Sequence, residues 1–291
     1  MSAKFGVAGN SDTFTKTVSR SSADAPAWLK SLGLDAYEYQ CGRGVRIGEK
    51  TGLQLRRSAE EAGIVLSLHA PYFISLSNPE EEALRKNIRY VLDSCRAADL
   101  LGANRIVIHS GALMKRTRRE ALDIAKRTLT RILRECDEAG FSHLTLCPET
   151  MGKLNQLGDL EEVLELCTLD ERLLPCIDFG HLYARSLGAL EGAEACEQML
   201  SRVEEILGTE RASRFHSHFS KIEFTPNGGE KRHLTLSDPG WGPDFRPLAE
   251  AAARRGWSPT FICESAGTQS EDAVTLKRIW SQCASRSAAH P

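Results

Sequence analysis

The sequence predicts a (β/α)8 barrel, the TIM-barrel fold of the α/β class, because short apolar runs alternate with longer amphipathic segments along its 291 residues. There are eight short runs. Each is rich in Val, Ile, Leu or Phe and too short for a helix, as expected of strands buried on both faces. Eight strand–helix units in about 290 residues match the count and length of such a barrel. A doubly wound open sheet is disfavoured, since no GxGxxG loop follows the first run.

The expected strands leave room for one helix between each consecutive pair, as the barrel requires. They span residues 5–9, 36–40, 64–70, 105–110, 143–149, 173–179, 215–220 and 259–265.

Amphipathic periodicity predicts helices between these strands. Residues 79–101 and 120–139 place apolar side chains at 3.6-residue spacing. The last helix is expected to open at Ser270, where Glu271 and Asp272 suit the positive end of the helix dipole. Five helices are expected to end at a glycine, which accepts the left-handed conformation of a helix end. These glycines are Gly33, Gly63, Gly102, Gly140 and Gly256.

The composition indicates one soluble domain over residues 1–291, with residues 285–291 expected to fray. No linker or change of composition divides the chain, and no stretch approaches the roughly 18 apolar residues of a membrane span. The first residues lack the apolar run of a signal peptide. Nine Cys without a CxxC pair favour thiols in a reducing cytoplasm. A formal net charge of −2 excludes a globally basic nucleic-acid binder, although it allows a basic face.

Ionisable side chains collect at or just beyond the carboxyl ends of the expected strands, where barrel active sites are built. Imidazoles and carboxylates that converge there suit zinc or manganese, so the sequence predicts a metal site. We interpret Glu149 and Glu264 as its catalytic carboxylates. The expected metal ligands are His69, His109, Glu149, Asp178, His181, His218 and Glu264, with His233 in the loop after the seventh strand.

Other residues of the same types have structural interpretations. His143 begins a strand, so we expect it at the opposite end of the barrel. His216 shares a strand face with His218 and could support the site. Cys147 and Cys176 are expected to fill the barrel one layer deeper.

The segment HAPYFISLSNP, from His69 to Pro79, resembles a motif of the endonuclease IV family, the zinc-dependent apurinic/apyrimidinic endonucleases among the xylose isomerase-like barrels. The resemblance extends over residues 6–264. Further motifs follow in the family's order: IVIHSG at His109, PETMGKLNQLG at Glu149, CIDFGH at Asp178 and His181, HFSK at His218, RH at His233, and CES at Glu264.

The resemblance implies two or three zinc ions, with manganese as a substitute. His69 and His109 would bind the first ion, and Glu149 would bridge it to a second. Asp178, His218 and Glu264 would complete the second site, and His181 and His233 would bind the third ion. The family's third ion also takes an Asp at the position of Lys231. Glu230 precedes that position by one residue. Two alternatives therefore remain open: Glu230 replaces the Asp as a ligand, or the third ion is lost.

The activity that the resemblance implies is hydrolysis of double-stranded DNA 5′ to an abasic site by a metal-bridging hydroxide. We expect a monomer whose substrate-binding residues follow the strands. They are Tyr72, Arg43, Arg46, Lys115, Arg116 and Lys231. The loop of residues 40–46 and the residues after His218 differ from the family's pattern, which weakens the expectation of DNA more than that of metal chemistry.

Two other functions fit parts of the pattern. A sugar or sugar-phosphate isomerase or epimerase would use one divalent ion on Glu149, Asp178, His218 and Glu264. A barrel that only binds a ligand or partner would have a vestigial metal site. The number of ions bound per chain discriminates among the three.

Overall fold

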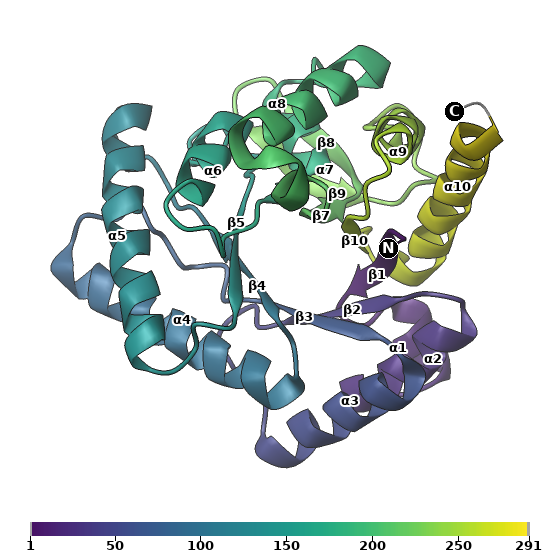
Figure 1. Cartoon of the computed structure of the whole chain (residues 1–291), viewed down its shortest axis with the longest axis horizontal. Coiled ribbons are helices and arrows are strands. Elements are labelled where there is room, and N and C mark those ends of the chain that lie inside the picture. Colours follow the sequence, from purple (N-terminus) through teal and green to yellow (C-terminus); the bar gives the residue numbers. More distant parts are fainter. Residues whose placement is uncertain (1, 290–291) are drawn as a thin grey trace.

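Eight parallel strands close into a barrel surrounded by helices in the computed structural model, which describes residues 2–289 (Figure 1). The expected fold class is therefore confirmed. The strands are β1 (Lys4–Ala8), β2 (Ala36–Gln40), β3 (Val65–His69), β4 (Arg105–His109), β5 (Thr145–Glu149), β6 (Cys176–Asp178), β7 (His216–Phe219) and β10 (Thr260–Cys263). They follow the order β1-β10-β7-β6-β5-β4-β3-β2 around the barrel.

The outer layer consists of helices that connect successive strands. They are α1 (Asp12–Thr17), α2 (Ala25–Ser31) with the 3-10 turn η1 (Ser22–Asp24) before it, α3 (Glu49–Ala62), α4 (Glu81–Leu101), α5 (Arg118–Glu138), α6 (Leu160–Cys167), α7 (Phe179–Arg185), α8 (Gly192–Ala212), α9 (Phe245–Arg254) and α10 (Gln269–Ala289). All five predicted terminal glycines have positive φ angles, between 67° and 85°. Glycine without a Cβ atom adopts this conformation at little cost.

All the strands from β3 onward in the barrel are shorter than predicted, and β6 is shortened most. β6 ends at Asp178 because this residue caps α7, its side chain accepting a hydrogen bond from the backbone N–H of His181. β5 begins only at Thr145. His143 therefore lies before the strand, half exposed, with its Nε2 atom 3.0 Å from the Asp99 carboxylate. This position agrees with its predicted place away from the carboxyl ends of the strands.

Aromatic rings pack where the barrel closes between β1 and β10. Phe5 and Phe261 stack at 5.3 Å between ring centroids, and Phe245 and Trp280 pack against Phe261 from α9 and α10. Inside the barrel, Cys147 and Cys176 belong to a small buried cluster, as predicted. All nine cysteines are buried and free of disulfides.

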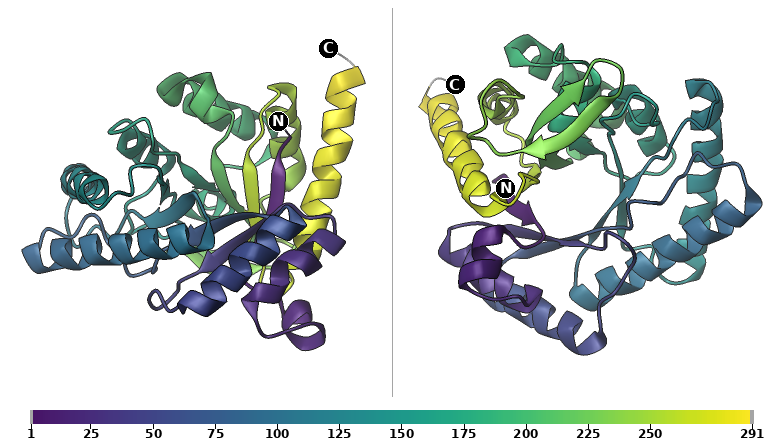
Figure 2. Two further views of the ribbon diagram at one scale, coloured as in Figure 1. Left: turned by 60° about the horizontal axis from the view of Figure 1, so that its bottom comes forward. Right: turned by 180° about the vertical axis from the view of Figure 1, so that it is seen from behind.

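A hairpin interrupts the strand–helix alternation after β7, and it was not predicted. It consists of β8 (Lys221–Thr225) and β9 (Gly229–Leu234), which pair antiparallel around a turn that contains Asn227 and Gly228. Figure 2 (right) shows the hairpin in green beside the barrel opening. It places His233, expected in a loop, on a strand.

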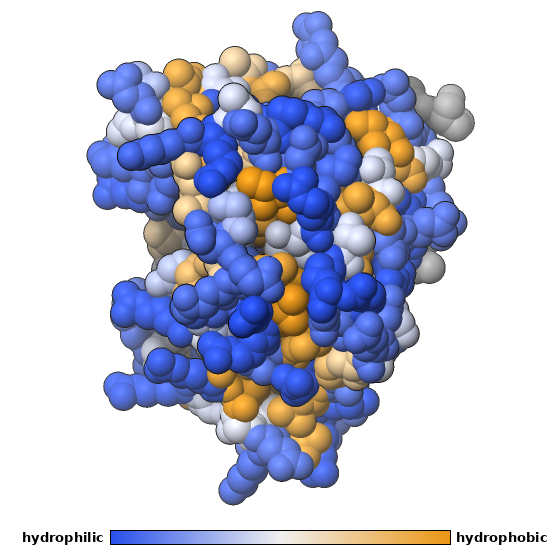
Figure 3. Space-filling model, turned by 90° about the vertical axis from the view of Figure 1, so that its left-hand side faces the viewer, coloured by the Kyte–Doolittle hydropathy of each residue, from blue (hydrophilic) through white to orange (hydrophobic). Residues whose placement is uncertain are grey.

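Helix α10 extends to Ala289. Residues 290–291 of the segment expected to fray lie outside the described residues. Within residues 2–289, no helix is long and apolar enough to span a bilayer. Hydrophilic residues cover most of the side formed by α4 and α5, with apolar residues in scattered groups (Figure 3).

Gly6 provides a test of how closely the strands approach. A Cβ atom on Gly6 would lie 2.2 Å from the Ala36 carbonyl oxygen on β2. We expect Gly6→Ala to lower the free energy of unfolding by at least about 1–3 kcal/mol through overpacking, measured by urea denaturation. Gly48→Ala is the control, because nothing lies within 4 Å of its added Cβ atom. Equal stability of the two variants would contradict the packing.

Candidate metal centre

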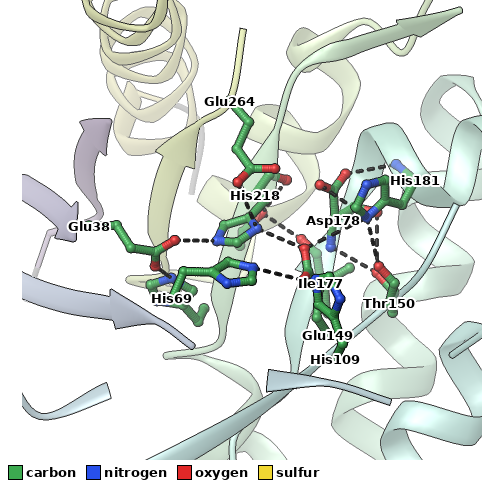
Figure 4. A network of polar contacts seen from close by, with 12 residues as sticks. Glu38, His69, His109, Glu149, Thr150, Ile177, Asp178, His181, His218 and Glu264 are labelled. Atoms are coloured by element: carbon green, nitrogen blue, oxygen red, sulfur yellow. Dashed lines mark hydrogen bonds and ion pairs between the residues drawn. The ribbon is translucent and has the colours of Figure 1, made fainter. Parts of the chain in front are cut away.

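The site is built at the carboxyl end of the barrel by side chains that alternate along the strands. Side chains two residues apart point to the same face of a strand. Figure 4 shows Glu149 and His218 together in the site. Each has a neighbour two residues earlier that lies deeper in the barrel, Cys147 for Glu149 and His216 for His218. The structure brings together the predicted carboxylates and imidazoles at the ends of β3 to β7 and β10, although consecutive members lie up to 46 positions apart in the sequence, from His218 to Glu264.

Glu149 is the centre of the cluster and is 1% exposed. Its Oε2 atom lies 3.3 Å from Nε2 of His69 and 3.2 Å from Nε2 of His109. Its Oε1 atom lies 2.8 Å from Nδ1 of His218. The two oxygens therefore face different imidazoles, which is the geometry of a carboxylate that can bridge two ions.

Asp178 and Glu264 complete a second group around His218. The ligand atoms of Glu149, Asp178, His218 and Glu264 all lie within 4.8 Å of one another. Oδ1 of Asp178 accepts the backbone N–H of His181 as the cap of α7, which leaves Oδ2 buried without a hydrogen bond. A buried carboxylate oxygen is costly unless it is paired or coordinates a cation. Nδ1 of His181 lies 3.3 Å from this oxygen but hydrogen-bonds the Thr150 carbonyl, so Oδ2 is available to a divalent ion.

Four imidazoles are oriented in one way. Nδ1 of His69 hydrogen-bonds the Ala70 carbonyl, and Nδ1 of His109 that of Tyr72. Nδ1 of His181 hydrogen-bonds the Thr150 carbonyl, and Nδ1 of His233 the Ser220 hydroxyl. In each ring, Nε2 faces a carboxylate of the site. In His181, Nδ1 also lies 3.3 Å from Oδ2 of Asp178. Fixing one ring nitrogen by the protein is typical of metal-binding histidines.

A third group joins His181, Glu230 and His233. Nε2 of His181 lies 3.6 Å from one oxygen of Glu230, and Nε2 of His233 lies 4.0 Å from the other. These separations are too long for good hydrogen bonds and leave room for an ion between the groups. The structure places Glu230, and not Lys231, beside the two imidazoles.

A β-bulge in the hairpin explains this shift. Ile222 pairs with His233, while Phe224 pairs with Glu230, so the partner strand carries one extra residue between these pairs. Ile222 and Phe224 point to the same face, and the bulge therefore brings His233 and Glu230 to one face as well. Lys231 turns away, with its Nζ atom 2.5 Å from Glu223.

The hairpin is anchored to the loop after β5. The backbone N–H of Glu230 donates to the Gly152 carbonyl over 3.0 Å. A Cβ atom at residue 152 would lie 2.7 Å from Cβ of Glu230 and 3.0 Å from the His181 ring. Gly152, within the PETMGKLNQLG motif, therefore allows the hairpin to approach closely enough to deliver Glu230.

A cavity of about 280 Å³ opens over these groups. Tyr72, which is half exposed, lines it, as do Gln40, Lys153 and Gln156. The other residues expected to bind substrate are not among its lining. Arg43, Arg46, Lys115 and Arg116 lie in the loops after β2 and β4, and Lys231 lies on the outer face of β9.

Sequence reasoning missed Glu38 and undervalued His216. Both side chains are completely buried inside the barrel, 2.8 Å apart. Glu38 also contacts Nε2 of His218 at 2.9 Å. An acidic residue within the otherwise apolar run AYEYQ was the available signal, since a buried charge requires a partner.

Burial and mutual charge set the protonation of the site. Burial lowers the pKa of His69, but the hydrogen bond and charge of Glu149 outweigh this effect and raise it to about 9. For His181, burial is outweighed by the charges of Asp178, Glu230 and Glu149, which raise the pKa to about 9. Burial raises the pKa of Glu149, but the imidazoles around it hold that pKa well below the usual range. Without an ion, protons on these imidazoles balance the carboxylates at neutral pH.

The donor set fits divalent metals. Imidazole nitrogens and carboxylate oxygens are ligands of zinc and manganese. A deeper group of Cys176, His216 and His218 also has ligand atoms within 4.8 Å of one another. Glu38 already engages Nε2 of both imidazoles in that group, while Nδ1 of His216 is buried without a hydrogen bond.

Comparisons with known proteins identify the family. The chain belongs to the xylose isomerase-like TIM barrel family, whose model matches residues 26–280. An uncharacterized protein of Methanocaldococcus jannaschii is 35% identical over 254 residues, which cover 87% of this chain and 90% of that protein. A probable endonuclease 4 of Methanosphaera stadtmanae is 25% identical over 174 residues, 58% of this chain and 59% of that protein. These matches confirm the resemblance that the motifs indicate.

Solved structures share the fold at low identity. Endonuclease IV from Thermus thermophilus matches with a TM-score of 0.67 and 19% identity, covering 97% of this chain and 99% of that one. A D-tagatose 3-epimerase-like protein matches with a TM-score of 0.70 and 18% identity, covering 98% of each chain. At these identities the likeness establishes the fold alone.

The raised pKa values predict that an ion must displace protons. At pH 7 we expect zinc binding to release about three protons, one each from His69, His181 and His218, whose pKa values are all raised, because a metal ligand must be deprotonated. Calorimetric titration of the metal-free protein with zinc in buffers of different ionisation enthalpy measures this number. Apparent affinity should rise with pH up to about 9. A binding enthalpy that does not depend on the buffer would contradict the protonation described.

The same shifts predict how the stability of the metal-free protein depends on pH. A raised histidine pKa stabilises the fold fully below the unfolded value of 6.5, and this contribution is lost as pH rises through about 9. We expect the urea midpoint to fall between these pH values in the chelated protein. Zinc should remove that fall. A flat profile without metal would show that the imidazoles are not protonated.

Proposed function

We propose that this member of the xylose isomerase-like TIM barrel family is a metal-dependent phosphodiesterase that hydrolyses DNA 5′ to abasic sites, with zinc as the metal and manganese as a substitute. The observation that carries the proposal is the set of three ligand groups, two of them joined by Glu149. Bound divalent ions would supply a water of lowered pKa and positive charge for the phosphoryl oxygens.

Each group has a defined part in holding the ions. His69 and His109 would hold the first, with Glu149 shared between the first and the second. Asp178, His218 and Glu264 would complete the second. The third ion would lie among His181, Glu230 and His233, each of which offers one ligand atom within 4.8 Å of the others.

The chain's own residues would orient the substrate around these groups. Tyr72 presents an exposed ring at the edge of the cavity, where it can pack against a nucleotide. Lys153, also in the cavity lining, offers a cation to a phosphate. An abasic nucleotide costs little to unpair from a duplex, and its sugar needs less room than a complete nucleotide.

The wider basic surface is smaller than the run from Lys115 to Arg119 suggests. Arg118 binds Glu162 at 2.5 Å, and Arg119 lies 3.3 Å from Glu165. Lys115 and Arg116 precede α5, so they remain the residues of this run proposed to contact DNA phosphates, together with Arg43 and Arg46 from the loop after β2.

A sugar isomerase or epimerase is the second candidate, because Glu149, Asp178, His218 and Glu264 alone could hold one ion. In that case the carboxylates would move a proton beside a carbonyl group. The additional imidazoles of the other two groups favour the phosphodiesterase, since one ion does not require them.

Cleavage of a duplex with one abasic site tests the activity directly. With zinc or manganese we expect a single cut on the 5′ side that leaves a 3′-hydroxyl, and no cut after chelation. Loss of a residue that only hydrogen-bonds a metal ligand typically lowers activity by about 10–100-fold. Glu149→Gln should lower the cleavage rate by more than this, because Glu149 would bind two ions directly. The control is His143→Gln, whose exposed imidazole contacts Asp99. No metal-dependent cleavage by the wild type would reject the proposal.

Metal stoichiometry tests the third group separately. Elemental analysis should find about three zinc ions per wild-type chain and about two after Glu230→Gln, because this change removes a carboxylate that would hold the third ion. Lys231→Gln is a matched control, since its side chain lies on the opposite face of the bulge. One ion per wild-type chain would favour the sugar enzyme instead.

A further inference from the structure

A buried carboxylate lies directly beneath the metal centre. Glu38 comes from β2, is completely buried, and touches four hydrogen-bond donors (Figure 4). Its Oε1 atom accepts from Nε2 of His218 at 2.9 Å and from Nε2 of Gln40 at 3.1 Å. Its Oε2 atom accepts from Nε2 of His216 at 2.8 Å and from Oγ of Ser67 at 2.9 Å.

This arrangement fixes which nitrogen of His218 carries hydrogen. An ionised carboxylate only accepts hydrogen bonds and has about four acceptor positions, all of which are filled in Glu38. Nε2 of His218 must therefore be a donor. A neutral imidazole has one N–H group, so Nδ1 carries the free lone pair. Nδ1 lies 2.8 Å from Glu149 and 3.5 Å from Glu264, inside the metal centre.

His218 is thus reversed relative to the other imidazoles of the site. His69, His109 and His233 are each held at Nδ1 by a carbonyl or hydroxyl oxygen and direct Nε2 at the carboxylates. His181 is also held at Nδ1 by a carbonyl oxygen, although this nitrogen lies 3.3 Å from Asp178 as well. His218 is held at Nε2 by a carboxylate and directs Nδ1 at them. A carboxylate that receives the second N–H of an imidazole makes that imidazole a more basic ligand.

We propose that Glu38 is a positioning residue that holds His218 in its Nε2–H form and presents Nδ1 to the ion bound with Asp178 and Glu264. This inference rests on the metal centre of the proposed function. Ser67 and His216 supply the remaining hydrogen bonds that keep the carboxylate in place. Gln40 extends the network to the cavity wall, since its side chain lines the cavity.

Nitrogen NMR of the zinc-loaded wild type tests the orientation without any substitution. Protein labelled with ¹⁵N-histidine should give one imidazole that binds zinc through Nδ1 and is protonated at Nε2, assigned to His218 by its loss in His218→Gln. The other zinc-bound rings should be bound through Nε2. A wild type in which His218 binds zinc through Nε2 would overturn the inference.

Zinc affinity tests the consequence. Competition with a chelator should show that Glu38→Gln weakens one zinc by about 10–100-fold, the usual loss for an outer-shell partner. Asp35→Asn is the matched control, because Asp35 is a carboxylate that directly precedes the same strand, β2. Its side chain accepts hydrogen bonds from the backbone N–H of Phe5 and from Lys277, away from the metal centre. The control should keep its zinc affinity within about twofold of wild type.

The outcomes separate the two proposals. A wild type that binds no zinc would reject the proposed function and this inference with it. A wild type that binds zinc while Glu38→Gln keeps its affinity would reject only the role of Glu38. Equal losses in Glu38→Gln and Asp35→Asn would indicate general destabilisation and would also reject it. If Glu38→Gln does not fold, the wild-type imidazole spectrum decides.

Discussion

The shared carboxylate of Glu149 is the interaction on which the rest of the site depends. It is buried at the carboxyl end of β5 and contacts imidazoles from β3, β4 and β7. A buried charge is unfavourable without partners, so these strand ends must meet around it. Closure of the barrel brings the imidazoles together, and Glu149 in turn provides the negative charge that lets them be buried there.

The sequence predicted the barrel and most of the centre because both follow from simple periodicities. Apolar runs located all eight strands, and a position at a strand end placed His69, His109, Glu149, Asp178 and Glu264 correctly in the fold. The hairpin could not be inferred in the same way. Its bulge shifts Glu230 by one residue relative to regular alternation, and bulges have no fixed sequence signal comparable to a hydrophobic period.

Glu38 was missed for a different reason. Its pairing with His216 and His218 joins residues about 180 positions apart in sequence, and it depends on how deep each side chain lies in the barrel. Barrel interiors are usually filled by branched apolar side chains. Here part of the layer beneath the metal centre is polar, with Glu38, Ser67 and His216 all buried. The four hydrogen bonds of Glu38 fix the position of its carboxylate, and with it the orientation of His218 above, although Nδ1 of His216 makes no hydrogen bond.

The hairpin has a mechanical consequence. Glu230 and His233 belong to β9 of the hairpin, which lies outside the barrel, whereas His181 belongs to α7, which directly follows strand β6 of the barrel. An ion bound by these three residues would cross-link the hairpin to the barrel. Thermodynamic linkage would then run in both directions: the ion would hold the hairpin more firmly against the barrel, and any displacement of the hairpin would weaken the binding of the ion by the same free energy.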